Sequence, residues 1–256
     1  EKIGPILEKT KGGDEFKNIN YEIALKRLTP VMRTIKKIKK ENSQKNLIGF
    51  CGGPFTVLTY MIEGGTSRKH LLVKKKIKED REDFASLIKM ITKLSIKYLE
   101  TQILNGVNLV KVFESWAGLL DKKDYEDFVI KPNKKIQETL KKKFPSIPII
   151  FFPRNSGKNV LEFVKNVNCD ILSLDKEFPR ELMKLAKEKQ IILQGNLDPQ
   201  ILIEGGKKLE EGVKKIMIEF SENDHIFNLS HGILPVTPIR NVEKTIDIIR
   251  KINETK

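Results

Sequence analysis

Six short apolar runs divide this chain, and each ends in a cluster of polar, glycine or aromatic residues. Between the runs lie amphipathic segments that are long enough to be helices. Most of the runs are rich in Leu and β-branched residues and alternate little, which is typical of parallel strands buried on both faces. The predicted strands are residues 46–50, 108–113, 148–152, 169–174, 190–194 and 225–229.

Helices are predicted over residues 21–40, 82–106, 121–143, 160–166, 180–189, 209–222 and 238–252. The order is one helix followed by six strand–helix units, which indicates an α/β fold with a parallel sheet. A closed (β/α)8 TIM barrel has eight strands and about 250 residues. We therefore predict a (β/α)8 TIM barrel that forms a single domain over residues 1–256. We expect its first two strands to be absent from the chain, which begins at Glu1 with a helix that lacks its strand.

An open, doubly wound sheet is the competing fold. It would place a glycine-rich phosphate-binding loop after an early strand. Neither a GxGxxG nor a Walker pattern occurs in the sequence, so the barrel is favoured.

The charge of the chain limits its partners. Its 256 residues carry a formal net charge of +14, and only eight of the 48 basic residues are arginines. Lysine-rich helix faces are typical of a solvated surface, and no basic DNA-reading helix or RNA-binding aromatic signature is present. We predict no nucleic-acid partner, although a basic surface would attract a small polyanionic substrate.

Compartment signals are few. No run approaches the roughly 18 apolar residues of a membrane helix, and no signal segment opens the chain. Two cysteines do not make a disulfide framework. We therefore expect no membrane association and a cytoplasmic setting. No HxH, HExxH or HxC grouping occurs, so no metal site is predicted.

Three polar residues near strand ends are candidate site residues: Tyr60, Ser115 and His231. Tyr60 follows a glycine-rich turn that would let a ligand approach the backbone, although it equally fits packing on an amphipathic segment. Ser115 can hydrogen-bond a ligand or cap the next turn. His231 ends the last strand, where a purely structural histidine is the alternative reading. His70 and His225 are read as surface or strand-edge residues.

Five segments resemble the uroporphyrinogen decarboxylase family of haem biosynthesis. They are GFCGGPFTVLTYMIEGG (49–65), KVFESWAGLL (111–120), IIFFP (149–153), LQGNLDP (193–199) and NLSHGILPVTP (228–238). The resemblance implies a cofactor-free homodimer that converts the four acetate side chains of uroporphyrinogen III into methyl groups, giving coproporphyrinogen III. It also implies that Tyr60, Ser115 and His231 bind the substrate carboxylates, and that the backbone around Phe50 lines the pocket.

One departure from the family concerns the catalytic residues. The family's arginine pair and its pyrrole-binding Asp belong to the two strands that we expect before residue 1. The catalytic residues of this chain are therefore unknown, and we expect residues 1–256 alone to be inactive. An inactive barrel remnant that binds porphyrin or a partner subunit is the alternative function. A zinc-dependent corrinoid methyltransferase is a weaker rival, because no cysteine lies near His231.

Overall fold

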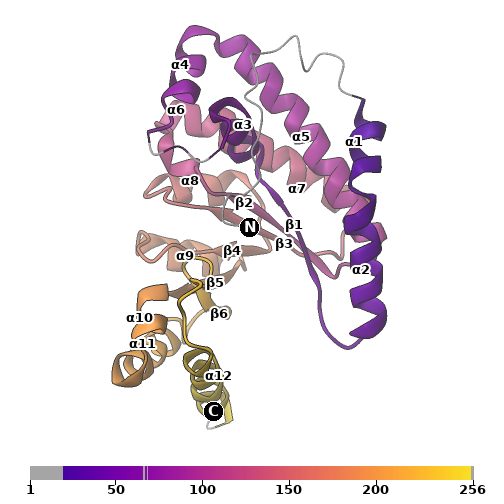
Figure 1. The fold of residues 1–256 in the computed structure, drawn as a ribbon. Coiled ribbons are helices and arrows are strands. Elements are labelled where there is room, and N and C mark those ends of the chain that lie inside the picture. Colours follow the sequence, from indigo (N-terminus) through magenta and orange to yellow (C-terminus); the bar gives the residue numbers. More distant parts are fainter. Residues whose placement is uncertain (1–19, 66, 68, 255–256) are drawn as a thin grey trace. The chain divides into compact units, whose positions relative to one another are not determined.

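Strands and helices alternate along the chain, as Figure 1 shows. The computed structural model describes residues 20–65, 67 and 69–254. The chain divides into two compact units, unit 1 over Glu1–Asn168 and unit 2 over Cys169–Lys256. The single domain expected from the sequence stays a prediction. Within the described residues, no helix is both long and apolar enough to cross a membrane.

The described residues of unit 1 form three parallel strands, β1 (Ile48–Gly52), β2 (Leu109–Glu114) and β3 (Ile149–Pro153), with β2 between the other two. Its helices are α1 (Tyr21–Arg27), α2 (Thr29–Glu41), α3 (Pro54–Glu63), α4 (Leu71–Glu79), α5 (Arg81–Leu104), η2 (Ala117–Leu119), α6 (Lys122–Tyr125), η3 (Glu126–Ile130), α7 (Lys131–Lys143) and α8 (Asn159–Asn166).

The core of unit 1 lies between these strands and helices. Val110 and Val112 alternate along β2 and are fully buried, and α3 and α5 both contact this strand. Phe84 of α5 is also fully buried. Its ring lies edge-on to the ring of Phe55 at 6.3 Å and to the ring of Phe128 at 4.8 Å. Aromatic side chains thus join α5, α3 and η3 into one packed layer.

Unit 2 contains three parallel strands, β4 (Ile171–Ser173), β5 (Ile192–Leu197) and β6 (His225–Leu229), with β5 in the middle. Its helices are α9 (Glu181–Glu188), α10 (Pro199–Glu204), α11 (Gly206–Glu219) and α12 (Ile239–Glu254). The side-chain amide of Asn241 donates to the carbonyl oxygen of Leu202 at 2.8 Å, which ties α12 to α10.

All six predicted strands are present, with ends that differ from the prediction by at most three residues. Two predicted helices are interrupted instead of continuous, in each case near a proline. The segment 21–40 breaks at Leu28, just before Thr29 and Pro30 open α2. The segment 121–143 contains a π-helical turn directly before Lys131 and Pro132. A proline lacks the N–H that a continuous helix would need at that position.

Helices α3, α4 and α10 were not predicted as separate elements. Five residues of α3 are buried, and its apolar residues lie around most of the helix. The helix starts at Pro54, directly after Gly52 and Gly53, and such a run of glycines and proline is typical of a loop, which obscured the start of the helix. Helix α10 has only six residues, which is short for any periodic pattern.

The packing of Phe84 gives a testable prediction for stability. Phe84→Ala should lower the free energy of unfolding by about 3–5 kcal/mol, because it removes a fully buried ring and leaves a cavity. Leu104→Ala on the same helix is the control, since Leu104 is 74% exposed and should change stability by less than about 0.5 kcal/mol. Denaturant unfolding of the three proteins measures both values. Equal stability of the two variants would contradict the assigned core.

Candidate functional site

The C-terminal ends of β1, β2 and β3 lie at one edge of unit 1, because the three strands are parallel. Backbone hydrogen bonds join the segments that follow them. The N–H of Gly53 donates to Phe113 at 2.9 Å, and the N–H of Arg154 donates to Glu114 at 3.1 Å. In (β/α) barrels this edge carries the functional residues.

The carboxylate of Glu114 is the most buried charged group at this edge, with 1% of the residue exposed. One oxygen accepts hydrogen bonds from the backbone N–H of Phe55 at 3.4 Å and from the Asn133 amide at 3.0 Å. The other accepts from the backbone N–H of Thr56 at 3.0 Å and from its hydroxyl at 2.9 Å. Glu114 thus satisfies N–H groups in the first turn of α3 that have no partner within the helix.

The environment of Glu114 explains two neighbouring features. A Cβ atom at Gly53 would lie 2.1 Å from Cδ of Glu114, so only glycine leaves room for the carboxylate. Burial raises the pKa of Glu114 to about 7, although its hydrogen-bond donors act in the opposite direction. Burial, together with the Glu114 charge, raises the pKa of the Cys51 thiol to about 12. Cys51 is therefore a protonated thiol and not a nucleophile at neutral pH.

Tyr60 lies on α3 in contact with an aromatic cluster. Its ring centroid is 6.0 Å from that of Trp116, which directly follows Ser115. The ring centroids of His70 and Trp116 are 4.3 Å apart, and His70 is 2% exposed. The prediction that His70 is a surface or strand-edge residue is therefore wrong. Its backbone has a φ of 49° before α4, a left-handed conformation that no sequence periodicity signals.

Two buried nitrogen atoms of this cluster, His70 Nδ1 and Trp116 Nε1, have no hydrogen-bond partner within the part of the chain that the structure describes. Burial lowers the pKa of His70, which favours the neutral imidazole at neutral pH. The cluster therefore offers polar atoms beside Tyr60 without adding a fixed charge there.

One face of the unit 1 sheet carries aromatic rings and a lysine. Phe50 of β1, Phe113 of β2 and Phe152 of β3 lie edge to face, with centroids 5.9 Å and 6.3 Å apart for successive pairs. Phe50 is 61% exposed. The ammonium group of Lys111 lies 4.8 Å from the centre of the Phe113 ring, and burial lowers its pKa to about 8. This face combines apolar surface with one buried cation.

Unit 2 holds the remaining predicted residue, His231. It is exposed just after β6, and its Nδ1 lies 3.2 Å from the carbonyl oxygen of Gly232. His225, at the start of β6, stacks on Phe220 with centroids 4.3 Å apart. Burial lowers the pKa of His225. His225 is a packed strand-edge residue, as predicted.

Asn196 shapes a turn within unit 2. Its amide donates to the carbonyl oxygens of Asp175 at 3.0 Å and Lys176 at 3.1 Å. Asp198 forms an ion pair with Lys176 at 2.7 Å and caps α10 through the N–H of Gln200. These contacts support a structural role for the GNLDP segment. Among the described residues, no three His, Cys, Asp or Glu side chains gather as they would around a metal ion.

Three of the four predicted site residues lie within unit 1: Phe50 on β1, Tyr60 on α3, and Ser115 directly after β2. The fourth, His231, lies within unit 2. The substrate-binding roles of these four residues stay predictions. Sequence reasoning did not assign the positions of Glu114 and Lys111. Strand alternation was the available signal, since Lys111 and Phe113 fall on one face of β2 and Glu114 falls on the other.

The pKa of Glu114 gives a testable prediction for the pH dependence of stability. In the unfolded chain the carboxyl group loses its proton near its ordinary pKa of 4.5, whereas the folded protein retains it to about pH 7. Between these values the folded state binds more protons, so this group lowers the free energy of unfolding as pH rises. Glu114→Gln should remove that contribution, which amounts to a few kcal/mol across the window because one pKa unit corresponds to about 1.4 kcal/mol.

Denaturant unfolding at several pH values across this window measures the effect. The matched control is Glu138→Gln, which changes an exposed glutamate of α7 and should leave the pH slope of the parent protein unchanged. The same slope in Glu114→Gln and in the parent protein would show that Glu114 does not titrate in this range.

Comparison with solved structures shows the fold. A methyltransferase from Methanosarcina mazei superposes with a TM-score of 0.71 and 17% identity, and the match covers 89% of this chain and 65% of that protein, just under two thirds. A B12-independent methionine synthase from Shewanella superposes with a TM-score of 0.61 and 15% identity, over 88% of this chain and 68% of that protein. These likenesses concern the fold alone, and the predicted α/β barrel class is confirmed.

Comparison of sequences shows the family. Residues 1–252 match the family described as uroporphyrinogen decarboxylase (URO-D). The chain is 41% identical to the uroporphyrinogen decarboxylase of Rickettsia bellii over 252 residues, which are 98% of this chain and 74% of that protein. It is 40% identical to the same enzyme of Orientia tsutsugamushi over 257 residues, 99% of this chain and 74% of that protein. The chain therefore belongs to the uroporphyrinogen decarboxylase family.

Proposed function

We propose that this protein decarboxylates the four acetate side chains of uroporphyrinogen III and releases coproporphyrinogen III. One observation carries the proposal: the family match extends over residues 1–252, and curated relatives with this enzyme name are about 40% identical over nearly the whole chain. The protein is thus a carboxy-lyase of porphyrin and haem biosynthesis. The likeness to methyltransferases rests on 17% identity or less and does not favour that chemistry.

The reaction can proceed without a cofactor. When a pyrrole ring of the substrate is protonated, it can accept the electron pair that remains after CO2 leaves. The exocyclic methylene carbon that results is then protonated to a methyl group, and the ring releases the proton it had gained, so that each step takes up one proton and releases one CO2. The protein has to bind an apolar macrocycle with eight carboxylates and stabilise the charge that develops during each step.

The described residues of unit 1 suit such a ligand. Phe50, Phe113 and Phe152 provide apolar surface on one face of the sheet, and Lys111 provides a cation on the same face. The formal net charge of +14 would attract a polyanion over a long range. We infer that Phe50 and Lys111 contact the substrate, the first through apolar surface and the second through a carboxylate.

Tyr60, Ser115 and His231 are the proposed hydrogen-bond donors to the acetate and propionate carboxylates. Glu114 does not bind substrate in this proposal, because its oxygens already accept four hydrogen bonds. It positions Ser115, its neighbour in sequence, and the helix that carries Tyr60. We further propose that the enzyme works as a homodimer, as the family resemblance implies. On the grounds of composition and sequence pattern, we propose that it does so in the cytoplasm, without nucleic acid or a membrane.

Turnover tests the proposed function directly. The complete reading frame that encodes this chain, expressed from its own start codon, would be incubated with uroporphyrinogen III without oxygen. The products would be oxidised to porphyrins and separated by their number of carboxyl groups. We expect intermediates with seven, six and five carboxyl groups, followed by the product with four. An unchanged octacarboxylate would refute the proposal.

Variants test the proposed substrate contacts. Tyr60→Phe and Ser115→Ala should each lower kcat/KM about 10- to 150-fold, since a hydrogen bond to a charged group is worth about 1.5–3 kcal/mol. The matched controls are Tyr21→Phe on α1 and Ser86→Ala on α5, which remove the same hydroxyl groups from helices that do not directly follow a strand. The controls should retain turnover within about twofold. Equal losses in a variant and its control would remove that residue from the site.

A further inference from the structure

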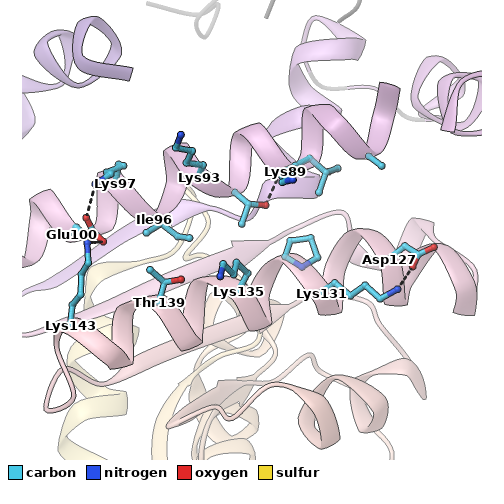
Figure 2. Close-up of a pocket in the computed structure, with 14 residues that line it drawn as sticks. Lys89, Lys93, Ile96, Lys97, Glu100, Asp127, Lys131, Lys135, Thr139 and Lys143 are labelled. Carbon is cyan, nitrogen blue, oxygen red and sulfur yellow. Dashed lines mark hydrogen bonds and ion pairs between the residues drawn. The ribbon is translucent and has the colours of Figure 1, made fainter. Parts of the chain in front are cut away.

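A groove runs along the outer surface of α5 and α7, away from the residues assigned to the substrate. Its volume is about 600 Å³, which lies in the range of pockets that bind ligands. Ile88, Ile96 and Pro132 belong to its lining and are largely buried. Figure 2 shows the two helices side by side with the lining side chains between and along them. The floor of the groove is therefore apolar.

Lysines line both edges of this groove. They are Lys89, Lys93 and Lys97 on α5, and Lys131, Lys135 and Lys143 on α7. All six are exposed. Residues four positions apart lie next to one another on a helix face, so each helix presents its lysines as a row that is slightly inclined to its axis. The two rows enclose the apolar floor.

Within the part of the chain that the structure describes, acidic residues form ion pairs with these lysines at the two ends of the groove. At one end, Glu100 forms ion pairs with Lys97 at 3.5 Å and with Lys143 at 2.6 Å. At the other end, Asp127 forms an ion pair with Lys131 at 2.6 Å.

The middle of the groove has a different charge balance. Across the described residues, Lys89, Lys93 and Lys135 have no acidic partner. The ammonium group of Lys93 lies 4.7 Å from the centre of the Tyr21 ring, a cation–π contact that brings no negative charge to the groove. The centre of the groove is therefore positive above an apolar floor.

We propose that this groove is the docking site for an acidic amphipathic helix of a partner protein. From Ala85 to Glu100 the lining of α5 extends over about 22 Å at 1.5 Å per residue, which matches a helix of about four turns. The apolar stripe of such a helix would contact the floor, and rows of Glu or Asp on its flanks would face the two rows of lysines. This is the helix-in-groove mode of recognition, with charge complementarity that sets the partner and its orientation.

Three other occupants fit the groove less well. A second copy of this chain, related by a twofold axis, would place lysine rows against lysine rows. A lipid bilayer is flat and would not reach a floor recessed between two helices. A nucleic-acid backbone would pair with the lysines but would leave the apolar floor without a partner.

A designed peptide tests this proposal. The probe is a fluorescent 18-residue helical peptide, about five turns long, with Leu along one stripe and Glu rows on both sides of it. A peptide of the same composition, scrambled so that no stripe forms, is its control. Binding to the full chain would be followed by fluorescence anisotropy. We expect the designed peptide to bind, the scrambled peptide to bind at least about tenfold more weakly, and added salt to weaken the binding.

Charge-reversal variants locate the binding. Lys89→Glu combined with Lys135→Glu should weaken peptide binding at least about tenfold, because both changes place a negative charge at the centre of the groove. The matched control is Lys36→Glu with Lys40→Glu, two exposed lysines of α2 that give the same change in net charge. It should change affinity by less than about twofold. Circular dichroism would verify that both variants are folded.

The remaining outcomes overturn the proposal. If the designed and scrambled peptides bound with equal affinity, or if the two double variants lost equal affinity, peptide binding would depend on the net charge of the chain and not on the groove. Groove-dependent binding of phosphatidylglycerol vesicles, or of single-stranded RNA, in place of the designed peptide would assign the surface to a membrane or to nucleic acid.

Discussion

The geometry of unit 1 depends on one buried carboxylate. Glu114 ends β2, and its two oxygens accept hydrogen bonds from the first turn of α3 and from Asn133 of α7. Burying a charge is costly unless it is hydrogen-bonded, and here four donors and the positive end of a helix offset part of that cost, while the raised pKa reflects the remainder. Ser115 directly follows Glu114, and Tyr60 lies on α3. The side chain of Glu114 therefore positions the backbone segments that carry both of these hydroxyl groups.

The sequence predicted strands such as β3 and β4 well, because burial on both faces leaves a compositional signature that needs no tertiary knowledge. In β1 and β6, burial alternates along the strand, and the apolar run with its flanking turn residues was the signal. Prediction failed where the signal depends on the neighbours of an element. Helix α3 starts in a Gly-Gly-Pro run that is typical of a loop, whereas His70 follows polar residues and yet packs on Trp116. Ser115 was identified as a candidate, but the partners of Glu114 come from α3 and α7, about 20 to 60 residues away in sequence, and no local pattern connects them.

The lysines show a similar limit of local patterns. Adjacent lysines, such as Lys141, Lys142 and Lys143, point in different directions around a helix and read as a solvated surface. The lysines along the groove are separated by four positions, or by eight between Lys135 and Lys143, and therefore stay close to one face. The spacing along each helix is visible in the sequence, but the pairing of two rows across an apolar floor requires knowing that α5 packs against α7. Only the fold makes a groove out of two ordinary helix surfaces.

Helix α5 shows how one element can serve two surfaces. Its buried residues, among them Phe84 and Leu99, cover a wide arc that contacts the strands and the neighbouring helices. This wide arc leaves a narrow exposed strip, and Lys89, Lys93 and Lys97 occupy it. A residue on the strip is separated from the strand ends by the full thickness of a packed helix, and distant sites without shared partners contribute to stability independently. The outer surface of α5 can therefore change its charge pattern while the inner surface keeps the packing that positions β1 and β2.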